Sequence, residues 1–476
     1  MQHTVFPILE NAVNEKAFTA WSYANNEIAV STFYCDEVRL PFSGLSDLKG
    51  VFHPVFDLSS LTKPLFLGQV FWERFKDNAD EIHASLFDII DDSSNFGALL
   101  KQFFTSVPNL SAAHLLNHQS GLPAWFWFGI GLWSFKDKSE QSRSECHWDS
   151  MPPGQLKQRV TDNLTMRCLK NLDNNKIGSE TIYSDLNYFL LTRILECLKK
   201  KKVSHWEEEL NLLNNRSGSQ FRHASIGGMK NRVCIPQFSY QIHSQTDSDS
   251  FAPDGAELFG PIHDTNANIL ASLGKKEAVV SGHAGLCGDV LDVSNALNQI
   301  SKNRVFSQSA PPQRFVQGFD TPSSEHSQAG IPHWPIDPSE KFIGHLGYTG
   351  TSFWLRFKNM TLENNDYTNP ISELQNKKNA PEKYILLTNR TAQRLHMGSE
   401  NTPRITVESN LKTGEFKYYI SNKKQTLAAI TEDDFYSEIY FYKNQKIVWD
   451  EARLNKPTDI SDLRRKCGKL TWFGFD

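Results

Sequence analysis

The stretch FDLSSLTKPLFLGQVFWERF, residues 56–75, decides most of what this sequence predicts. The part from Ser60 onward is typical of a helix. Pro64 is tolerated only near the start of a helix, where its missing N–H needs no partner. The helix must therefore begin close to Ser60, which places Ser60 at the positive end of the helix dipole.

Ser60 and Lys63 are three residues apart in this predicted helix, so their side chains share one face. Serine is a poor nucleophile until another group takes its proton, and a desolvated lysine can take that proton or lower the pKa of a neighbour. The helix start also favours developing negative charge. The pair is therefore a candidate nucleophile and activator, although the bare Ser-x-x-Lys pattern is common.

Elsewhere the pattern predicts a mixture of strands and helices. Residues 17–34 favour two strands around a turn at Asn25, and residues 384–388 favour a buried strand. Residues 184–198 predict a helix that Ser184 or Asp185 caps, with Lys199 to Lys202 near its C-terminal end. Polar stretches at 136–160, 208–250 and 303–340 indicate long surface loops. Beyond residue 400 the sequence alternates as hairpins, which predicts a C-terminal β-rich appendage over 401–476.

Bulk properties exclude several functional classes. The 476 residues carry a net charge of −4, which gives no general attraction to nucleic acid or anionic membranes. No apolar run has the length of a membrane span, and the N-terminus lacks the pattern of a signal peptide. Seven scattered cysteines without a CxxC pair favour reduced thiols. We therefore expect a cytoplasmic globular protein.

Six segments follow one another in this order: FDLSSLTKPL (56–65), LLNHQSGLP (115–123), YSDLNYFLL (183–191), IHDTNAN (262–268), SGHAGLCGDVLDV (281–293) and GHLGYTGTSFW (344–354). Together they resemble the serine β-lactamase and penicillin-binding-protein superfamily, in particular its class C-like esterase branch. The resemblance implies an α+β fold, with a central antiparallel sheet flanked by helices and an all-helical subdomain. It divides the chain into a hydrolase domain at 1–400, with the helical subdomain inserted at roughly 65–330, and the appendage at 401–476.

The resemblance also implies roles for individual residues. Ser60 matches the acylated serine, Lys63 its helical partner, and Tyr183 a general base held as a phenolate by nearby cations. Asp185 stands where many relatives have asparagine. A carboxylate can form an ion pair with Lys63, but it cannot donate a hydrogen bond to a substrate carbonyl as an amide does.

A third element of the superfamily, Lys-Thr-Gly, is matched here by His345-Leu346-Gly347. Histidine supplies a cation for a substrate carboxylate only when it is protonated, so the resemblance favours an esterase over a β-lactamase. The backbone N–H groups of Tyr348 and Ser60 would form the oxyanion hole. A literal Lys-Thr-Gly at 412–414 lies between two predicted strands and indicates a hairpin turn.

We therefore expect an acyl-enzyme on Ser60 that needs no metal or cofactor and hydrolyses small acyl esters, amides or peptides. The alternatives are a peptidase for D-amino-acid amides or peptidoglycan-like peptides, a non-catalytic binding module of the same fold, and a metallohydrolase using His263, Asp264 and His283. His118 is expected to form hydrogen bonds at a helix end. The aromatic run from Trp125 to Phe128, with Trp133 beyond it, predicts either core packing or an apolar wall for an acyl group.

Overall fold

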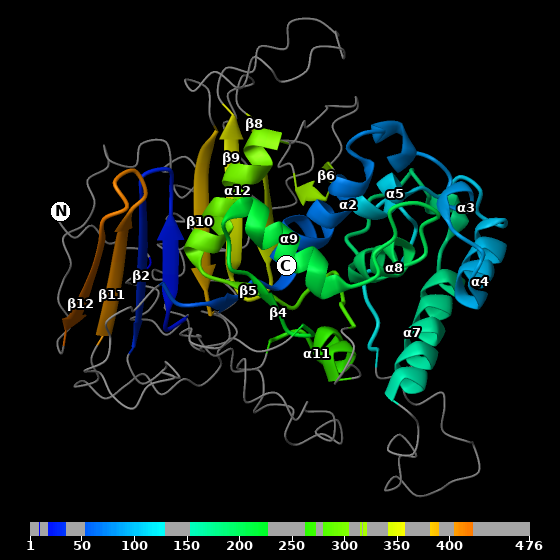
Figure 1. Cartoon of the computed structure of the whole chain (residues 1–476), viewed down its shortest axis with the longest axis horizontal. Coiled ribbons are helices and arrows are strands. Elements are labelled where there is room, and N and C mark those ends of the chain that lie inside the picture. Colours follow the sequence, from blue (N-terminus) through cyan, green and yellow to red (C-terminus); the bar gives the residue numbers. More distant parts are fainter. Residues whose placement is uncertain are drawn as a thin grey trace, which may run out of the picture.

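A computed structural model describes eleven parts of the chain: residue 9 and residues 18–34, 53–128, 153–226, 262–272, 279–303, 315–316, 318–320, 341–357, 381–389 and 404–421. The fold is α+β, with a large antiparallel sheet and helices beside it (Figure 1). Within the described residues, no helix has both the length and the apolarity that crossing a membrane requires.

The large sheet has nine described strands in the order β12-β11-β2-β1-β10-β9-β8-β7-β6, and every neighbouring pair is antiparallel. The N-terminal hairpin thus lies between strands from the far end of the chain. The strands are β1 (Trp21–Ala24), β2 (Ile28–Tyr34), β6 (Phe315–Val316), β7 (Phe319–Asp320), β8 (Lys341–Gly347), β9 (Thr351–Phe357), β10 (Glu382–Thr388), β11 (Arg404–Asn410) and β12 (Phe416–Ser421).

The hairpin predicted around Asn25 is confirmed. The Asn25 side chain accepts hydrogen bonds from the backbone N–H groups of Glu27 and Ile28, at 2.7 and 2.9 Å. A side chain that binds the backbone in this way mimics a turn, which fixes the register of β1 on β2. The buried strand predicted at 384–388 is confirmed as part of β10.

Most described helices lie beyond the end of the sheet that carries β8 and β6, to the right in Figure 1. Helix α12 packs directly on β1 and β10. Helix α8 is the centre of the helical layer, since it contacts α5, α7 and the turn that contains Lys63. The helices are α2 (Gly68–Phe75), α3 (Leu86–Ile89), α4 (Asn95–Phe104), α5 (Ala112–Leu116), α7 (Pro153–Lys170), α8 (Asp185–Leu195), α9 (Trp206–Ser217), α11 (Thr265–Ser272) and α12 (Val290–Asn303).

The region 65–330 is not purely helical. Besides β6 and β7 it contributes β4 (Arg222–His223) and β5 (Leu286–Gly288), which pair with β3 (Phe56–Asp57) in a second, three-stranded sheet. This small sheet holds the strand that leads directly into Ser60.

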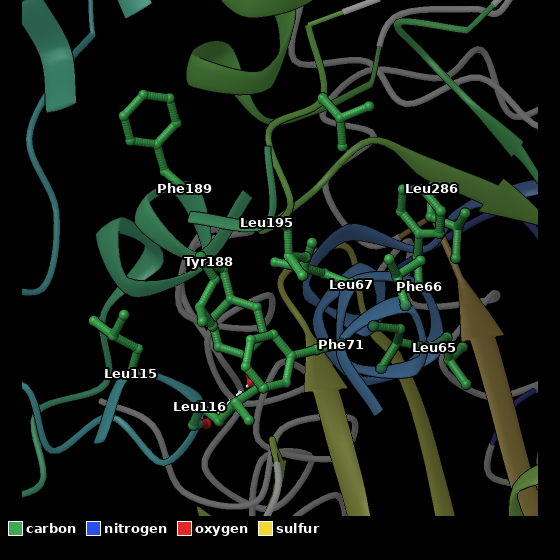
Figure 2. Close-up of a cluster of buried hydrophobic side chains, with 14 of the residues drawn as sticks. Leu65, Phe66, Leu67, Phe71, Leu115, Leu116, Tyr188, Phe189, Leu195 and Leu286 are labelled. Atoms are coloured by element: carbon green, nitrogen blue, oxygen red, sulfur yellow. Dashed lines mark hydrogen bonds between the residues drawn. The ribbon is translucent and has the colours of Figure 1, made fainter. Parts of the chain in front are cut away.

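The core lies where the segment after Ser60 meets helix α8. Figure 2 shows this cluster of fully or almost fully buried side chains: Leu65, Phe66, Leu67 and Phe71 from the first segment, Leu115 and Leu116 from α5, Tyr188, Phe189 and Leu195 from α8, and Leu286 from β5. Burying a large apolar side chain contributes about 1.5–3 kcal/mol. The segment that carries the candidate nucleophile is therefore among the most firmly packed parts of the molecule.

All three predicted loops are partly wrong. The predicted loop 303–340 contains the strands β6 and β7. Helix α7 starts at Pro153, inside the predicted loop 136–160, and α9 with β4 occupies the start of the predicted loop 208–250. Helix α9 forms in spite of its polar composition because Trp206, Leu210 and Asn214 recur every four residues and are buried. Gly218 then ends it in the left-handed conformation, at φ +74°. Residues 129–152 and 227–250 lie outside the described residues, as does Trp133.

The described part of the C-terminal segment joins the large sheet instead of standing apart from it as an appendage. Strand β11 pairs with β2 over its whole length, so the β11–β12 hairpin extends the sheet at one edge. The literal Lys412-Thr413-Gly414 is the turn of this hairpin, as predicted, with the left-handed φ of +71° at Gly414. Residues 422–476 lie outside the described residues.

Candidate active site

Ser60 lies in a 3₁₀ turn, Ser59–Leu61, that passes into a π-helical turn, Lys63–Leu67, and then into α2. The prediction that the helix begins close to Ser60 is confirmed. Its first residue, Ser59, has the left-handed φ of +48°, which costs a non-glycine residue about 1–2 kcal/mol. The hydrogen bond from the Ser59 N–H to the Asp57 carboxylate, at 2.8 Å, holds this strained turn.

Lys63 is fully buried, and its amine lies among oxygen atoms. It donates hydrogen bonds to Ser60 Oγ at 2.9 Å and to the His283 carbonyl at 3.2 Å, and it forms an ion pair with Asp185 Oδ1 at 2.7 Å. The Tyr183 hydroxyl is hydrogen-bonded to both Lys63 and Ser60. The structure therefore brings the predicted residues Ser60, Lys63, Tyr183 and Asp185 together around one hydroxyl group.

The loop after α5 holds Tyr183 in place. The Ile182 N–H donates to the His118 carbonyl at 2.9 Å, and the Ser184 N–H donates to His118 Nδ1 at 3.0 Å. The predicted hydrogen-bonding role of His118 is confirmed. Ser184 is the N-cap residue of α8, as predicted, but its hydroxyl does not cap the helix and instead donates to the Pro123 carbonyl at 2.7 Å. Helix α8 also ends at Leu195, before the residues predicted to complete it.

Asp185 changes the electrostatics of the Lys63–Tyr183 pair. Burial alone lowers the pKa of Lys63, but the attraction of Asp185 and Tyr183 outweighs it, so the pKa rises. Burial also raises the pKa of Tyr183, and the nearby Asp185 adds to this rise while Lys63 opposes it. Both groups therefore hold their protons at neutral pH. The phenolate expected at Tyr183 is not the resting form, because burial and, to a smaller extent, Asp185 raise the pKa of Tyr183 in spite of Lys63.

A second buried ion pair lies beside the first. His283 Nε2 is 3.1 Å from Asp264 Oδ1, and Nδ1 faces the Ser281 carbonyl at 3.2 Å. Both ring nitrogens thus face an acceptor, which favours the doubly protonated ring. Burial lowers the pKa of His283, but the attraction of Asp264 outweighs this effect, so the pKa is raised above its ordinary value. Burial raises the pKa of Asp264 and His283 lowers it, to about 2 overall.

The ligand set considered from the sequence, His263, Asp264 and His283, is only partly assembled. Asp264 and His283 are in contact, whereas the ring of His263 stacks on Tyr348, with centroids 4.6 Å apart. Among the described residues, Asp185 instead joins Asp264 and His283, with ligand atoms within 4.8 Å of one another. Because the Lys63 ammonium is already 2.7 Å from Asp185, this set could hold a metal ion only if Lys63 moved away.

A cavity of about 480 Å³ opens beside Ser60. Its described lining comes from segments far apart in the sequence: Ser59, Ser60, Ala124, Trp125, Tyr183, Asp185, His263, Asp264, Thr265, Asp320, His345, Leu346 and Tyr348. The aromatic run is divided between two environments, since Trp125 lines the cavity while Phe128 is fully buried in the core.

The end of β8 forms one wall of this cavity. His345 is buried and faces the Leu346 carbonyl through Nδ1 at 2.8 Å. At Gly347 a Cβ atom would lie 2.0 Å from the Thr351 hydroxyl and 2.9 Å from the Leu58 carbonyl, so only glycine fits. This close approach brings β8 against the turn that carries Ser60.

The Tyr348 N–H, one of the two expected oxyanion donors, binds the Ser59 hydroxyl at 3.2 Å. The sequence reasoning missed Ser59. The only signal for it was the spacing to Asp57, two residues earlier, because an aspartate often accepts the N–H of the second residue after it. A substrate oxygen that enters the oxyanion hole would have to replace the Ser59 hydroxyl at this donor.

Comparison with known proteins adds no relative, because no protein-family model and no curated protein matches this chain.

Proposed function

We propose that this chain is a serine hydrolase that acts on carboxylic esters or amides through a covalent acyl-enzyme on Ser60. One observation carries the proposal: Lys63 Nζ lies 2.9 Å from Ser60 Oγ, and the Tyr183 hydroxyl is bonded to both, inside a cavity that a small substrate can enter. A serine flanked by two groups that can take and return a proton is the arrangement that nucleophilic catalysis needs.

The chemical steps follow from the protonation states. Because Lys63 and Tyr183 both hold their protons at rest, the pair must first lose one proton to solvent. It then takes the proton of Ser60 as Oγ forms a bond to the substrate carbonyl carbon. The intermediate collapses, the bond to the leaving group breaks, and the pair returns the proton to that group. Water then attacks the acyl ester on Ser60, and the pair transfers a proton from the water to Oγ. The acid leaves and the Ser60 hydroxyl is restored.

The fold supports a relationship to the serine β-lactamase and penicillin-binding-protein superfamily. A large antiparallel sheet flanked by helices, with the cavity between the end of β8 and the start of α8, fits that architecture. We favour an esterase of this fold over a β-lactamase or a peptidase for D-amino-acid substrates. The reason is His345, which provides no permanent cation for a substrate carboxylate.

The test is adduct mapping. The folded chain is treated with a fluorophosphonate and, in parallel, with a β-lactam and a panel of small acyl esters, and the modified peptide is located by mass spectrometry. We expect a fluorophosphonate adduct on Ser60 and turnover of esters. Folded protein with no adduct on Ser60 and no turnover would instead favour a binding module, and turnover that a chelator abolishes would favour a metallohydrolase.

We also infer a reducing, cytoplasmic compartment for this hydrolase. Cys168, Cys197 and Cys287 are buried thiols without a disulfide, as is usual in cytosolic proteins. Thiol titration of the denatured protein, isolated without reductant, should find all 7 cysteines free. A disulfide in the isolated protein would contradict this location.

A further inference from the structure

Two aromatic side chains are exposed in the same cavity as the nucleophile. Four large apolar side chains among the described residues are exposed: Leu99, Trp125, Leu212 and Tyr348. The two aromatic ones, Trp125 at 49% and Tyr348 at 48% exposure, both line the cavity beside Ser60. Aromatic rings carry a large apolar surface, and exposed ones that share a concave site are typical of ligand binding.

The ring of Tyr348 packs on a second ring and on a segment that is anchored by hydrogen bonds. It stacks on His263 at 4.6 Å with 30° between the ring planes. Asp57 connects both partners to the nucleophile turn: its carboxylate accepts the His263 N–H and the Ser59 N–H, each at 2.8 Å, and its carbonyl accepts the Thr349 hydroxyl at 2.9 Å. The ring therefore has a fixed position before any ligand arrives.

Trp125 stands on an equally fixed loop. On one side, the Ala124 carbonyl accepts the N–H of Asp185 at 3.0 Å. On the other side, the fully buried Asn266 donates to the Phe126 carbonyl at 2.9 Å and accepts the Phe128 N–H at 2.8 Å. Asn266 follows His263 by three residues, so the single segment 262–268 supports both aromatic walls. Walls that are ordered in advance lose little entropy when a ligand binds.

The remaining charges of the cavity indicate what the walls can hold. Asp185, Asp264 and Asp320 line it, and none of the described lining residues is a lysine or an arginine. The adjacent cations, Lys63 and His283, are already paired with Asp185 and Asp264. A substrate carboxylate would therefore lie near acidic side chains and find no cation of its own among the described lining residues, which is unfavourable at a low local dielectric. An uncharged ring faces no such cost.

Tyr348 also ties the subsite to the reacting carbonyl. Its backbone N–H is the expected oxyanion donor, and its ring belongs to the same residue. A group that packs on this ring must therefore be attached close to the carbonyl carbon. We propose that Trp125 and Tyr348 form a subsite for an uncharged aromatic group in the acyl part of the substrate. This proposal rests on the proposed hydrolase function.

The experiment compares acyl groups that share one leaving group. Acetyl, phenylacetyl, cyclohexylacetyl and succinyl esters of 4-nitrophenol are supplied to the full chain, and kcat/KM is measured for each. We expect the phenylacetyl ester to exceed the acetyl ester by about tenfold and to exceed the cyclohexyl ester as well, because ring stacking adds to apolar burial. The succinyl ester, which carries a carboxylate, should be the poorest of the four.

Variants then locate the preference. Trp125→Ala and Tyr348→Ala should each reduce the phenylacetyl-to-acetyl ratio by about fivefold or more, while Trp125→Phe should keep most of it. The matched control is Leu212→Ala, which removes a similarly exposed apolar side chain on α9, away from the cavity. Circular dichroism confirms that each variant is folded, and the ratio cancels any general loss of activity.

Failure of this proposal is distinct from failure of the proposed function. A wild-type chain that hydrolyses all four esters at similar kcat/KM, or variants whose ratio equals that of Leu212→Ala, would overturn the aromatic subsite and leave the hydrolase intact. A chain that forms no acyl-enzyme with any ester would overturn the hydrolase itself.

Discussion

The cavity joins two regions built on opposite principles. Its floor includes Ser60, Tyr183, Asp185 and Asp264, and the buried Lys63 and His283 form ion pairs with the two aspartates. Its rim consists of Trp125, Tyr348 and His263, where aromatic rings face the cavity. Under the proposed function, the floor would control where protons lie, and the rim would control which acyl group fits. Variants of the floor should therefore change rate and pH dependence, and variants of the rim should change selectivity.

The largest effect should come from Ser60→Ala. Removing the nucleophile of a serine hydrolase costs at least about 10³-fold in kcat. Ester hydrolysis should fall by at least that factor. Mass spectrometry should find no fluorophosphonate adduct on the peptide that contains position 60. A variant that keeps more than about a tenth of the activity would show that the floor does not carry the reaction.

Lys63→Met should lower both activity and stability. It leaves the Asp185 carboxylate, only 20% exposed, without its cation, and breaking such a buried pair costs about 3–5 kcal/mol. The double variant Lys63→Met/Asp185→Asn removes both charges and should recover much of this stability without recovering activity. Chemical denaturation and ester hydrolysis measured on the same samples separate the two effects. Recovery of activity in the double variant would contradict the role of Lys63.

Asp185→Asn should move the pH dependence without destroying the site. Asp185 raises the pKa of Tyr183 and of Lys63, so its removal lowers both. Since the reactive pair must lose one proton, log kcat/KM of the wild type should rise with pH into the alkaline range. In the variant this rise should occur at lower pH. An unshifted profile would mean that neither group is the base.

The same ion pair makes a separate prediction for stability. The folded-state pKa of Lys63 lies above its unfolded value of about 10.4, so the pair stabilises the fold fully at neutral pH. That contribution is lost as the pH rises through the folded-state pKa of Lys63. Denaturation midpoints of wild type and Asp185→Asn should therefore converge at strongly alkaline pH, and a constant difference would contradict the assignment.

A smaller effect should link Asp57 to the rim. Burial raises the pKa of Asp57 to about 6, against the hydrogen bonds from His263 and Ser59. Below that pH the carboxyl is protonated and can no longer accept both N–H groups equally well. The ratio of kcat/KM for the phenylacetyl ester to that for the acetyl ester should therefore fall by a few-fold from pH 7 to pH 5. The general effect of pH on the rate cancels in this ratio. A ratio that stays constant would show that Asp57 does not position the rim.

Local patterns made part of this structure predictable. Asn25 in its turn, Pro64 at a helix start and the three-residue spacing of Ser60 and Lys63 depend on neighbours in sequence, which single-sequence reasoning can use. The ion pair of His283 with Asp264 depends on two loops meeting in space.

Other features lay beyond local patterns. The place of β11 beside β2 joins residues at least 370 positions apart, and no local pattern encodes that pairing. The neutral resting state of Tyr183 was missed for a related reason, since it needs the burial and the Asp185 distance that only the fold supplies.

The smallest effect should come from Lys412→Ala. This variant tests whether the literal tripeptide Lys-Thr-Gly at 412–414 contributes to the site, or only the matching position 345–347 on β8. Lys412-Thr413-Gly414 matches the superfamily motif letter by letter, yet it is an exposed hairpin turn whose backbone binds the Asn410 side chain. Lys412 forms an exposed ion pair with Glu27, and such pairs contribute about 0–1 kcal/mol. Hydrolysis and the phenylacetyl preference should both stay unchanged. A loss of activity would mean that this hairpin reaches the substrate, and the division between floor and rim would have to include a third region.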